Sequence, residues 1–227
     1  MSAVLTFKDV CSGYGDTEIL HGVSGTVREG ETLGVFGRNG VGKTTLSRTL
    51  VGELPTLKGE IFFNDQALGK RASFARRRSG LSYMPQTGMV FDSLSVRENL
   101  SLANSILPVE PYFEILPRLA ERLNQLAGSM SGGERKILSF VRIMLEDTTL
   151  AVLDEPSEGV QPENIENMQT CIRKKQETGT AFILVEQNLT MLTALADNFL
   201  GLDSGKIVFE RKSENCKREE LLAVLSV

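Results

Sequence analysis

The first third of the chain is built from short stretches in which apolar and polar residues alternate. This period of two predicts half-buried strands at residues 4–10, 19–27 and 59–64. Residues 32–36 form a short apolar run that ends at Gly37, which predicts a buried strand. Residues 45–51 then change to helical spacing. A strand followed by a glycine and a helix is therefore the central feature of this region.

The middle of the chain has helical periodicity in two stretches, residues 95–106 and 112–126. Ser95, followed by Glu98, predicts a capping box at the start of the first helix. Residues 71–78 form a basic run, which is expected to be a solvated face. We therefore expect an inserted helical subdomain at approximately residues 87–149.

The last third returns to alternating strands and helices. The expected elements are strands at 150–153 and 180–185, helices at 164–177, 189–196 and 217–225, and a hairpin of 199–202 with 206–210. This alternation predicts an α/β fold with a largely parallel sheet covered by helices on both faces. We expect one domain over residues 1–227, with approximately 1–86 and 150–227 forming its core and an N-terminal β-subdomain.

Composition narrows the class of protein. The 227 residues carry a net charge of −4, which argues against duplex DNA or RNA as the main partner. No apolar run approaches the roughly 18 residues that span a bilayer, so a membrane role is expected to come through a partner. The three cysteines lack metal-type spacing and predict reduced thiols in a cytosolic protein, and a single histidine cannot build a His-based zinc site.

A phosphate-binding loop is predicted between the strand at 32–36 and the helix after it. The segment fits the pattern GxxxxGK(S/T), in which glycines let successive backbone N–H groups point at phosphate oxygens. Its residues are Gly37, Arg38, Asn39, Gly40, Val41, Gly42, Lys43 and Thr44, and Thr45 continues the site into the helix. Lys43 is expected to reach the β and γ phosphates, and the Thr44 hydroxyl to bind Mg²⁺.

Two carboxylates follow the apolar strand at 150–153. Asp154 and Glu155 stand where the end of a parallel strand faces the ligand crevice. Asp154 is expected to hold Mg²⁺, directly or through water, and Glu155 to polarise the attacking water as a general base.

A second anion site is predicted where a Ser-Gly-Gly turn opens a helix. The residues are Met130, Ser131, Gly132, Gly133 and Glu134. N–H groups are exposed at such a helix start, and two phosphate sites in one chain make sense if one serves a neighbouring copy. In this order and spacing the sequence resembles the ATP-binding cassette (ABC) family, whose signature is LSGGQ.

The resemblance covers about residues 4–210 and implies further roles. Tyr14 occupies the place where the family stacks an aromatic ring on adenine, and Gln86 matches the Q-loop, which touches Mg²⁺. Residues 157–162 match the D-loop. The family pattern implies two chains, related or identical, that sandwich two ATP molecules. The signature residues of each chain then complete the site of the other.

The chain departs from the family at one position. Gln187 stands where most members carry a histidine that contacts the γ-phosphate, and His21 precedes the phosphate loop and cannot replace it by sequence position. Glutamine forms hydrogen bonds to phosphate or water but cannot shuttle a proton. Either hydrolysis persists with Glu155 as the base and Gln187 as a neutral positioning group, or the site is slow.

With this glutamine and with the residues at 154–162 and 185–188, the sequence resembles the ATPase subunits of importers for branched-chain amino acids or for urea and short-chain amides. The resemblance implies two transmembrane permease subunits, an extracytoplasmic binding protein and a location at the cytoplasmic face of the inner membrane. A soluble ABC clamp or regulator and a small-molecule kinase are the alternatives. The short tail after residue 211 does not clearly match the subfamily.

Overall fold

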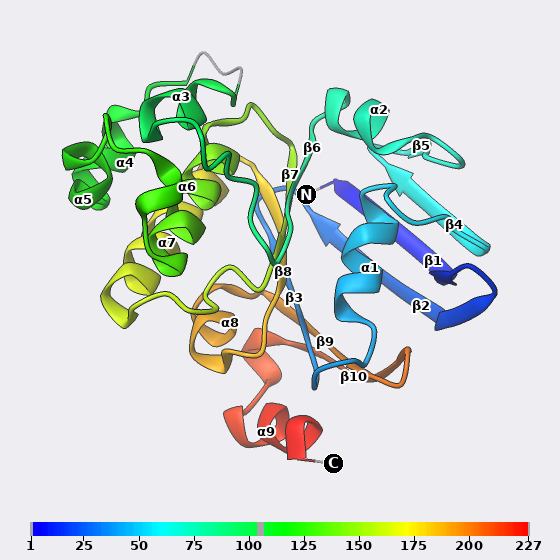
Figure 1. Ribbon diagram of the computed structural model, residues 1–227. Coiled ribbons are helices and arrows are strands. Elements are labelled where there is room, and N and C mark those ends of the chain that lie inside the picture. The colour runs from blue at the N-terminus through cyan, green and yellow to red at the C-terminus, as the bar shows by residue number, and fades with distance from the viewer. Residues whose placement is uncertain (1, 104–106, 227) are drawn as a thin grey trace.

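The centre of the molecule is a six-stranded sheet. The computed structural model describes residues 2–103 and 107–226, and the arrangement of its elements is shown in Figure 1. The sheet has the order β10-β9-β3-β8-β7-β6. Its strands are β3 (Thr32–Phe36), β6 (Leu81–Met84), β7 (Leu150–Asp154), β8 (Ala181–Val185), β9 (Asn198–Asp203) and β10 (Lys206–Lys212). Neighbours are parallel from β9 to β6, and β10 pairs antiparallel with β9, so the predicted α/β class is confirmed.

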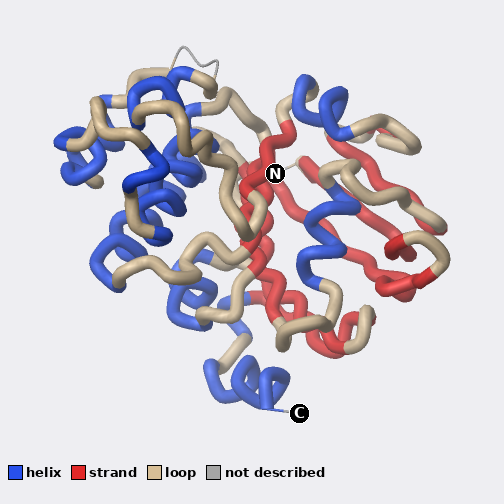
Figure 2. The backbone as a smooth tube through the Cα atoms, in the orientation of Figure 1, coloured by secondary structure: helices blue, strands red, loops and turns tan. Residues whose placement is uncertain are grey.

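A smaller antiparallel sheet forms beside it from the N-terminal residues. Its order is β2-β1-β4-β5, and its strands are β1 (Ala3–Tyr14), β2 (Thr17–Arg28), β4 (Lys58–Phe63) and β5 (Gln66–Ala67). The strands β5 and β6 were not expected from the sequence, because each is too short for a clear alternation. Figure 2 shows this sheet on the side of the molecule opposite to most of the helices.

Alternate residues of the central strands enter two different apolar layers. In β8, Phe182 and Leu184 pack with the helices α6 (Gly132–Leu145), α7 (Pro162–Glu177) and α8 (Leu189–Leu195). Ile183 and Val185 pack on the other side with α1 (Lys43–Leu50) and the antiparallel sheet. This period of two follows from the pleat of a strand, and it decides which layer each residue beyond the strand end will face.

The helical region between β6 and β7 is more broken than expected. Before α6, its described elements are α3 (Val96–Ser101), α4 (Glu110–Ile115), α5 (Pro117–Glu121) and the 3₁₀ turn η1 (Ala127–Ser129). The capping box of Ser95 and Glu98 is present, whereas the end of the helix expected at 95–106 falls partly outside the described residues. The single helix expected at 112–126 is wrong. Leu116 leaves helical geometry before Pro117, because a proline disfavours the helical conformation of the residue before it.

Three further helical elements lie in the described ranges. They are α2 (Ser73–Arg78), the 3₁₀ turn η2 (Ser213–Asn215) and α9 (Arg218–Ser226). Among the helices of the described ranges, none is both long and apolar enough to cross a membrane.

The basic run at 71–78 is not a uniformly solvated face. Arg76 is only 2% exposed, and its guanidinium donates to the carbonyls of Thr49 (3.0 Å) and Leu50 (2.7 Å). These carbonyls lie in the last turn of α1, where helix geometry leaves acceptors without intrahelical partners. Arg76 also donates to the carbonyls of Gly69 and Arg71. A buried cation therefore joins α2 to the C-terminal end of the helix that follows the predicted phosphate loop, where the helix dipole is negative.

We predict that Arg76→Met lowers the free energy of unfolding by about 2–4 kcal/mol, because the buried carbonyls of Thr49 and Leu50 lose this donor together with two part-buried carbonyls. The measurement is urea denaturation followed by circular dichroism. Arg78→Met is the matched control, since Arg78 is an exposed neighbour on the same helix, and it should stay within about 0.5 kcal/mol of the wild type. Equal stability of both variants would show that the Arg76 hydrogen bonds contribute nothing.

Candidate functional site

The segment between β3 and α1 curls tightly, as a phosphate loop must. Gly42 caps α1 with a φ of 109°, a conformation that side chains rarely adopt. A Cβ added at Gly37 would stand 2.3 Å from the Leu202 carbonyl oxygen, so the loop lies too close to β9 for any other residue. These two positions explain why the turn needs glycine, and they leave the first N–H groups of α1 free to face an anion.

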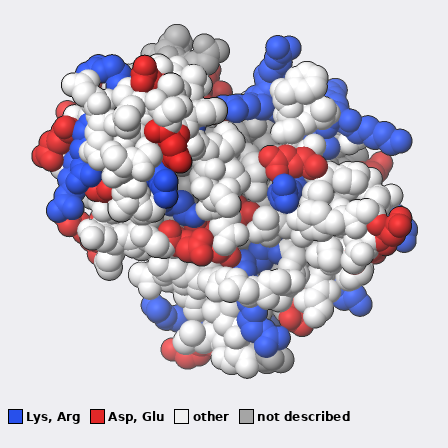
Figure 3. Space-filling model, viewed as in Figure 1, with Lys and Arg blue, Asp and Glu red and all other residues white. Residues whose placement is uncertain are grey.

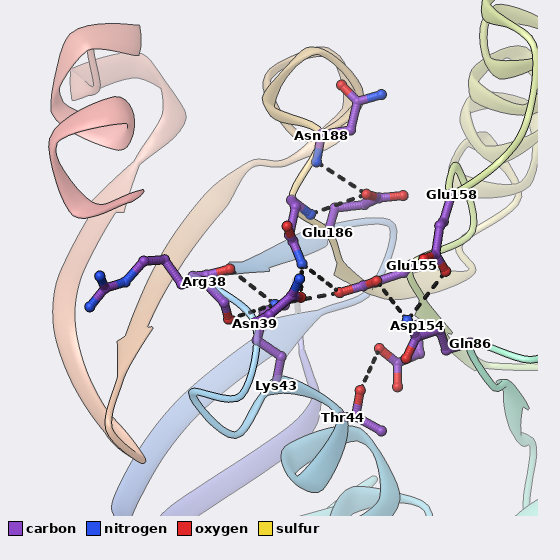
Figure 4. Close-up of polar contacts among 12 residues, drawn as sticks. Arg38, Asn39, Lys43, Thr44, Gln86, Asp154, Glu155, Glu158, Glu186 and Asn188 are labelled. Carbon is purple, nitrogen blue, oxygen red and sulfur yellow. Dashed lines mark hydrogen bonds and ion pairs between the residues drawn. The ribbon is translucent and has the colours of Figure 1, made fainter. Parts of the chain in front are cut away.

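Lys43 is the buried cation of this loop. Its side chain is 4% exposed, and Nζ donates to the carbonyls of Gly37 and Arg38, both at 3.0 Å. Nζ also lies 3.4 Å from Oε1 of Glu155 (Figure 4). The ammonium group is thus held by two neutral carbonyl oxygens of the loop. It also lies against the carboxylate of Glu155, the residue that directly follows β7.

Asp154, the last residue of β7, lies fully buried next to the start of α1. Thr44 Oγ1 donates to its Oδ1 at 3.3 Å, and the Tyr83 hydroxyl donates to its Oδ2 at 3.4 Å. Burial raises the pKa of Asp154 to about 6, the Thr44 hydrogen bond opposes this rise, and the neighbouring Glu155 carboxylate adds to it. Tyr83 was not identified from the sequence, because it matters only through this contact across the sheet.

The donors at this point fit Mg²⁺. The ion prefers oxygen ligands, and it is commonly held by one or two carboxylates together with substrate phosphates and water. Thr44 and Asp154 supply a hydroxyl and a carboxylate that already touch. Over the described part of the chain, no group of three or more His, Cys, Asp or Glu side chains could hold a metal on its own. The arrangement therefore suits an ion that arrives with a phosphate ligand.

Glu155 has an unusual backbone. Its φ is 48°, in the left-handed region that non-glycine residues seldom occupy, and its N–H donates to the Val185 carbonyl at 2.8 Å. The side chain accepts hydrogen bonds from Gln86 Nε2 (3.0 Å) and Gln187 Nε2 (3.3 Å). A strained backbone thus aims one carboxylate at the point where the phosphate loop, Gln86 and Gln187 meet. Figure 4 shows Glu155 beside Lys43 and Gln86.

Gln187 joins the same cluster from the end of β8. Its side-chain amide donates to the Asn39 side chain in the phosphate loop as well as to Glu155. His21 does not take this place: it lies in β2 and pairs with Glu18 at 3.0 Å.

Two further expected nucleotide contacts lie at the edge of the cluster. Tyr14, at the end of β1, is 45% exposed, and its hydroxyl accepts a hydrogen bond from Arg48 at 3.3 Å. Its ring therefore has free surface, and stacking on adenine remains a prediction. Thr45 is buried, and its carbonyl accepts a hydrogen bond from the Thr49 hydroxyl one turn later.

The Ser-Gly-Gly turn is not brought to the phosphate loop of its own chain. Figure 1 shows α6 and α1 on opposite sides of the central sheet. Ser131 and Glu134 form a capping box at the start of α6, and Gly132 has no neighbour within 4 Å of an added Cβ. These residues line a cleft of about 900 Å³ together with Gln86 and Glu158. Figure 3 shows acidic and basic side chains interspersed on this face of the molecule.

Two buried charged residues at this site were missed by the sequence analysis. Lys136 on α6 donates to the Gln86 carbonyl and lies 3.7 Å from Glu158. Glu186, directly after β8, is 2% exposed, and burial raises its pKa against the effect of its hydrogen bonds to Ser157 and Asn188. For Glu186 a signal existed, because a carboxylate that continues a fully apolar strand is expected to be buried and paired.

Comparison with known proteins gives consistent results. The ABC transporter family profile matches residues 20–158. The chain is 35% identical, over 90% of its length and 91% of the relative, to the high-affinity branched-chain amino acid transport ATP-binding protein BraG of Pseudomonas aeruginosa. It is 29% identical, over 91% of its length and 89% of the relative, to the lipopolysaccharide export system ATP-binding protein LptB of Escherichia coli. A solved ATP-binding subunit of an ABC transporter superimposes with a TM-score of 0.86 at 24% identity, covering 99% of this chain and all of that one, and shows the likeness of fold.

The raised pKa of Asp154 generates a stability prediction. The native pKa lies above the unfolded value, so ionisation of Asp154 lowers stability as the pH rises through about 4 to 6. Asp154→Asn should therefore raise the free energy of unfolding by about 1–3 kcal/mol at about pH 7.5, and by less than about 1 kcal/mol at about pH 4.

The measurement is chemical denaturation of both proteins at the two pH values, with a chelator present so that no cation offsets the charge. Asp147→Asn, at an exposed position that precedes β7, is the control and should show no such pH dependence. A lower stability of Asp154→Asn at both pH values would contradict the burial argument.

Proposed function

Because the chain belongs to the ABC transporter family and is an ATPase, we propose that it powers a membrane importer for branched-chain amino acids or for urea and short-chain amides. The observation that carries this proposal is the convergence on one point of Lys43, Glu155 and Gln187, which come from three separate segments. A cation, a carboxylate and a neutral amide at that point are the groups that phosphoryl transfer to water requires.

In the proposed mechanism the chain positions ATP and a water molecule. The N–H groups of the phosphate loop and the Lys43 ammonium hold the β and γ phosphates and stabilise the negative charge that develops there. The Glu155 carboxylate accepts a proton from the attacking water, and the Gln187 amide orients that water or the γ-phosphate without exchanging a proton. Thr44, Asp154 and Gln86 would hold Mg²⁺, which neutralises phosphate charge when bound.

We also propose that the active unit contains two ATPase chains. The helix N-terminus at Ser131–Glu134 lies across the sheet from the phosphate loop and is exposed at Ser131 and Gly132, so it is available to the ATP of a second chain. That chain is a copy or a related subunit. The ATP-driven closure of the pair would move the helical region, at about residues 87–149, against two permease subunits at the cytoplasmic face of the membrane.

The substrate class rests on similarity. The relative named for branched-chain amino acid transport is 35% identical, against 29% for the relative named for lipopolysaccharide export. The glutamine at position 187 and the sequence around Glu155 favour the amino acid and amide importers. An ABC module that acts as a soluble clamp is the second candidate, and an extracytoplasmic binding protein is expected only for the importer.

We predict that Lys43→Ala and Glu155→Gln each lower the kcat of ATP hydrolysis by about 100-fold or more, because each removes a group that acts on the reacting atoms. The measurement is phosphate release by the purified full chain with Mg²⁺ and ATP. Glu177→Gln, an exposed substitution at the far end of α7, is the control and should match the wild type. Undiminished turnover in either site variant would overturn the mechanism.

A second prediction tests the importer. Affinity purification of the chain from detergent-solubilised membranes of its native cells should recover two polytopic permeases and a second ATPase, identified by mass spectrometry. Cells that carry Glu155→Gln in place of the wild type should take up labelled leucine, or labelled urea and acetamide, at least about tenfold more slowly. Recovery of the chain with soluble partners only, and unchanged uptake of all three compounds, would favour the clamp.

A further inference from the structure

Glu186 is the most deeply buried carboxylate that the mechanism leaves unused. It is 2% exposed, and its two oxygens accept from three backbone N–H groups in two loops. Oε1 accepts from Ser157 at 2.8 Å, and Oε2 accepts from Gln187 and from Asn188, both at 3.2 Å. Backbone amides thus surround a charge that burial alone would disfavour, and each oxygen serves a different loop.

The strand period explains how adjacent residues reach different loops. In β8, Phe182 and Leu184 face the helical layer, so the next even-numbered position, Glu186, faces that layer too. Gln187 reaches the other way, to Asn39 and Glu155 in the nucleotide cluster. Figure 4 shows Glu186 between Glu155 and Asn188. A single buried side chain therefore stands between the nucleotide cluster and the helical layer.

The other loop held by Glu186 leads to the second anion site. Ser157 opens the D-loop at residues 157–162, and Val160 N–H donates back to the Ser157 carbonyl at 3.1 Å. A Cβ added at Gly133 would stand 2.6 Å from the Gly159 carbonyl oxygen, so the D-loop packs directly on the start of α6. A shift of Ser157 would therefore move the neighbours of the Ser-Gly-Gly turn.

We propose that Glu186 is a positioning residue for ATP hydrolysis, which fixes the Gln187 loop and the D-loop at one separation and so couples each nucleotide site to the signature turn of its own chain. The proposal rests on the proposed function. It requires a side chain with two acceptor oxygens at this place. A glutamine has nearly the same shape but presents an NH₂ group to one of the two loops, where the backbone also donates.

Glu186→Gln is expected to lower the kcat of ATP hydrolysis by about tenfold or more, with the KM for ATP and the affinity for a fluorescent ATP analogue changed by less than about threefold. The phosphate loop is untouched by the change, so binding should persist. Glu166→Gln, an exposed glutamate on α7, is the matched control and should match the wild type.

A double-mutant cycle separates positioning from general loss of structure. In a Gln187→Ala background, Glu186→Gln should cost less than about threefold in kcat, because part of its effect acts through Gln187. Effects that multiply fully, or a loss of ATP affinity as large as the loss of kcat, would overturn the proposal. So would an unchanged kcat in Glu186→Gln.

Amide hydrogen exchange of the wild type tests the geometry without a substitution. The N–H groups of Ser157, Gln187 and Asn188 should exchange at least about 100-fold more slowly than unprotected loop amides, because all three donate to a buried carboxylate. Exchange at free-loop rates would overturn the inference. If the wild type hydrolyses ATP and Glu186→Gln does so equally well, only this inference is refuted. If the wild type does not hydrolyse ATP, the proposed function is refuted as well.

Discussion

Parallel strands end together, and the functional cluster of this protein depends on that constraint. The strands β3, β8 and β7 are neighbours in the sheet, so the residues that follow them meet at one edge. The phosphate loop follows β3, Gln187 follows β8, and Glu155 follows β7. Segments more than a hundred residues apart in the chain become neighbours without any long excursion of a loop.

Several buried charged side chains lie at this edge of the sheet, and they differ in the number and kind of their hydrogen-bond partners. Lys43 is held by loop carbonyls and Glu186 by three backbone amides, so each has neutral partners of the right polarity. Among the described residues, Asp154 accepts from two hydroxyl donors, and its pKa rises to about 6. Burial raises the pKa of Glu186 as well, but its three amide donors tie it to two loops, whereas Asp154 offers a carboxylate that a bound cation can stabilise.

Features that depend on contiguous residues could be predicted from the sequence. The strand, glycine loop and helix at residues 32–51, the capping box of Ser95 and the strand before Asp154 were predicted correctly, because each is a local pattern of a few residues. The burial of Arg76 could not be predicted from the sequence, because the carbonyls that accept its hydrogen bonds lie in another helix. Contacts such as Tyr83 with Asp154 need the strand order, which no local pattern contains.

The place of β3 in the sheet also affects the order in which the central sheet can assemble during synthesis. It is the first central strand made, yet its two neighbours, β8 and β9, are among the last, at residues 181–185 and 198–203. A nascent chain that ends before them has the phosphate-loop sequence but lacks both strands that pair with β3. Contacts of such large sequence separation slow folding and expose unpaired strand edges meanwhile. The phosphate loop is thus held by strands that are synthesised well after the loop itself.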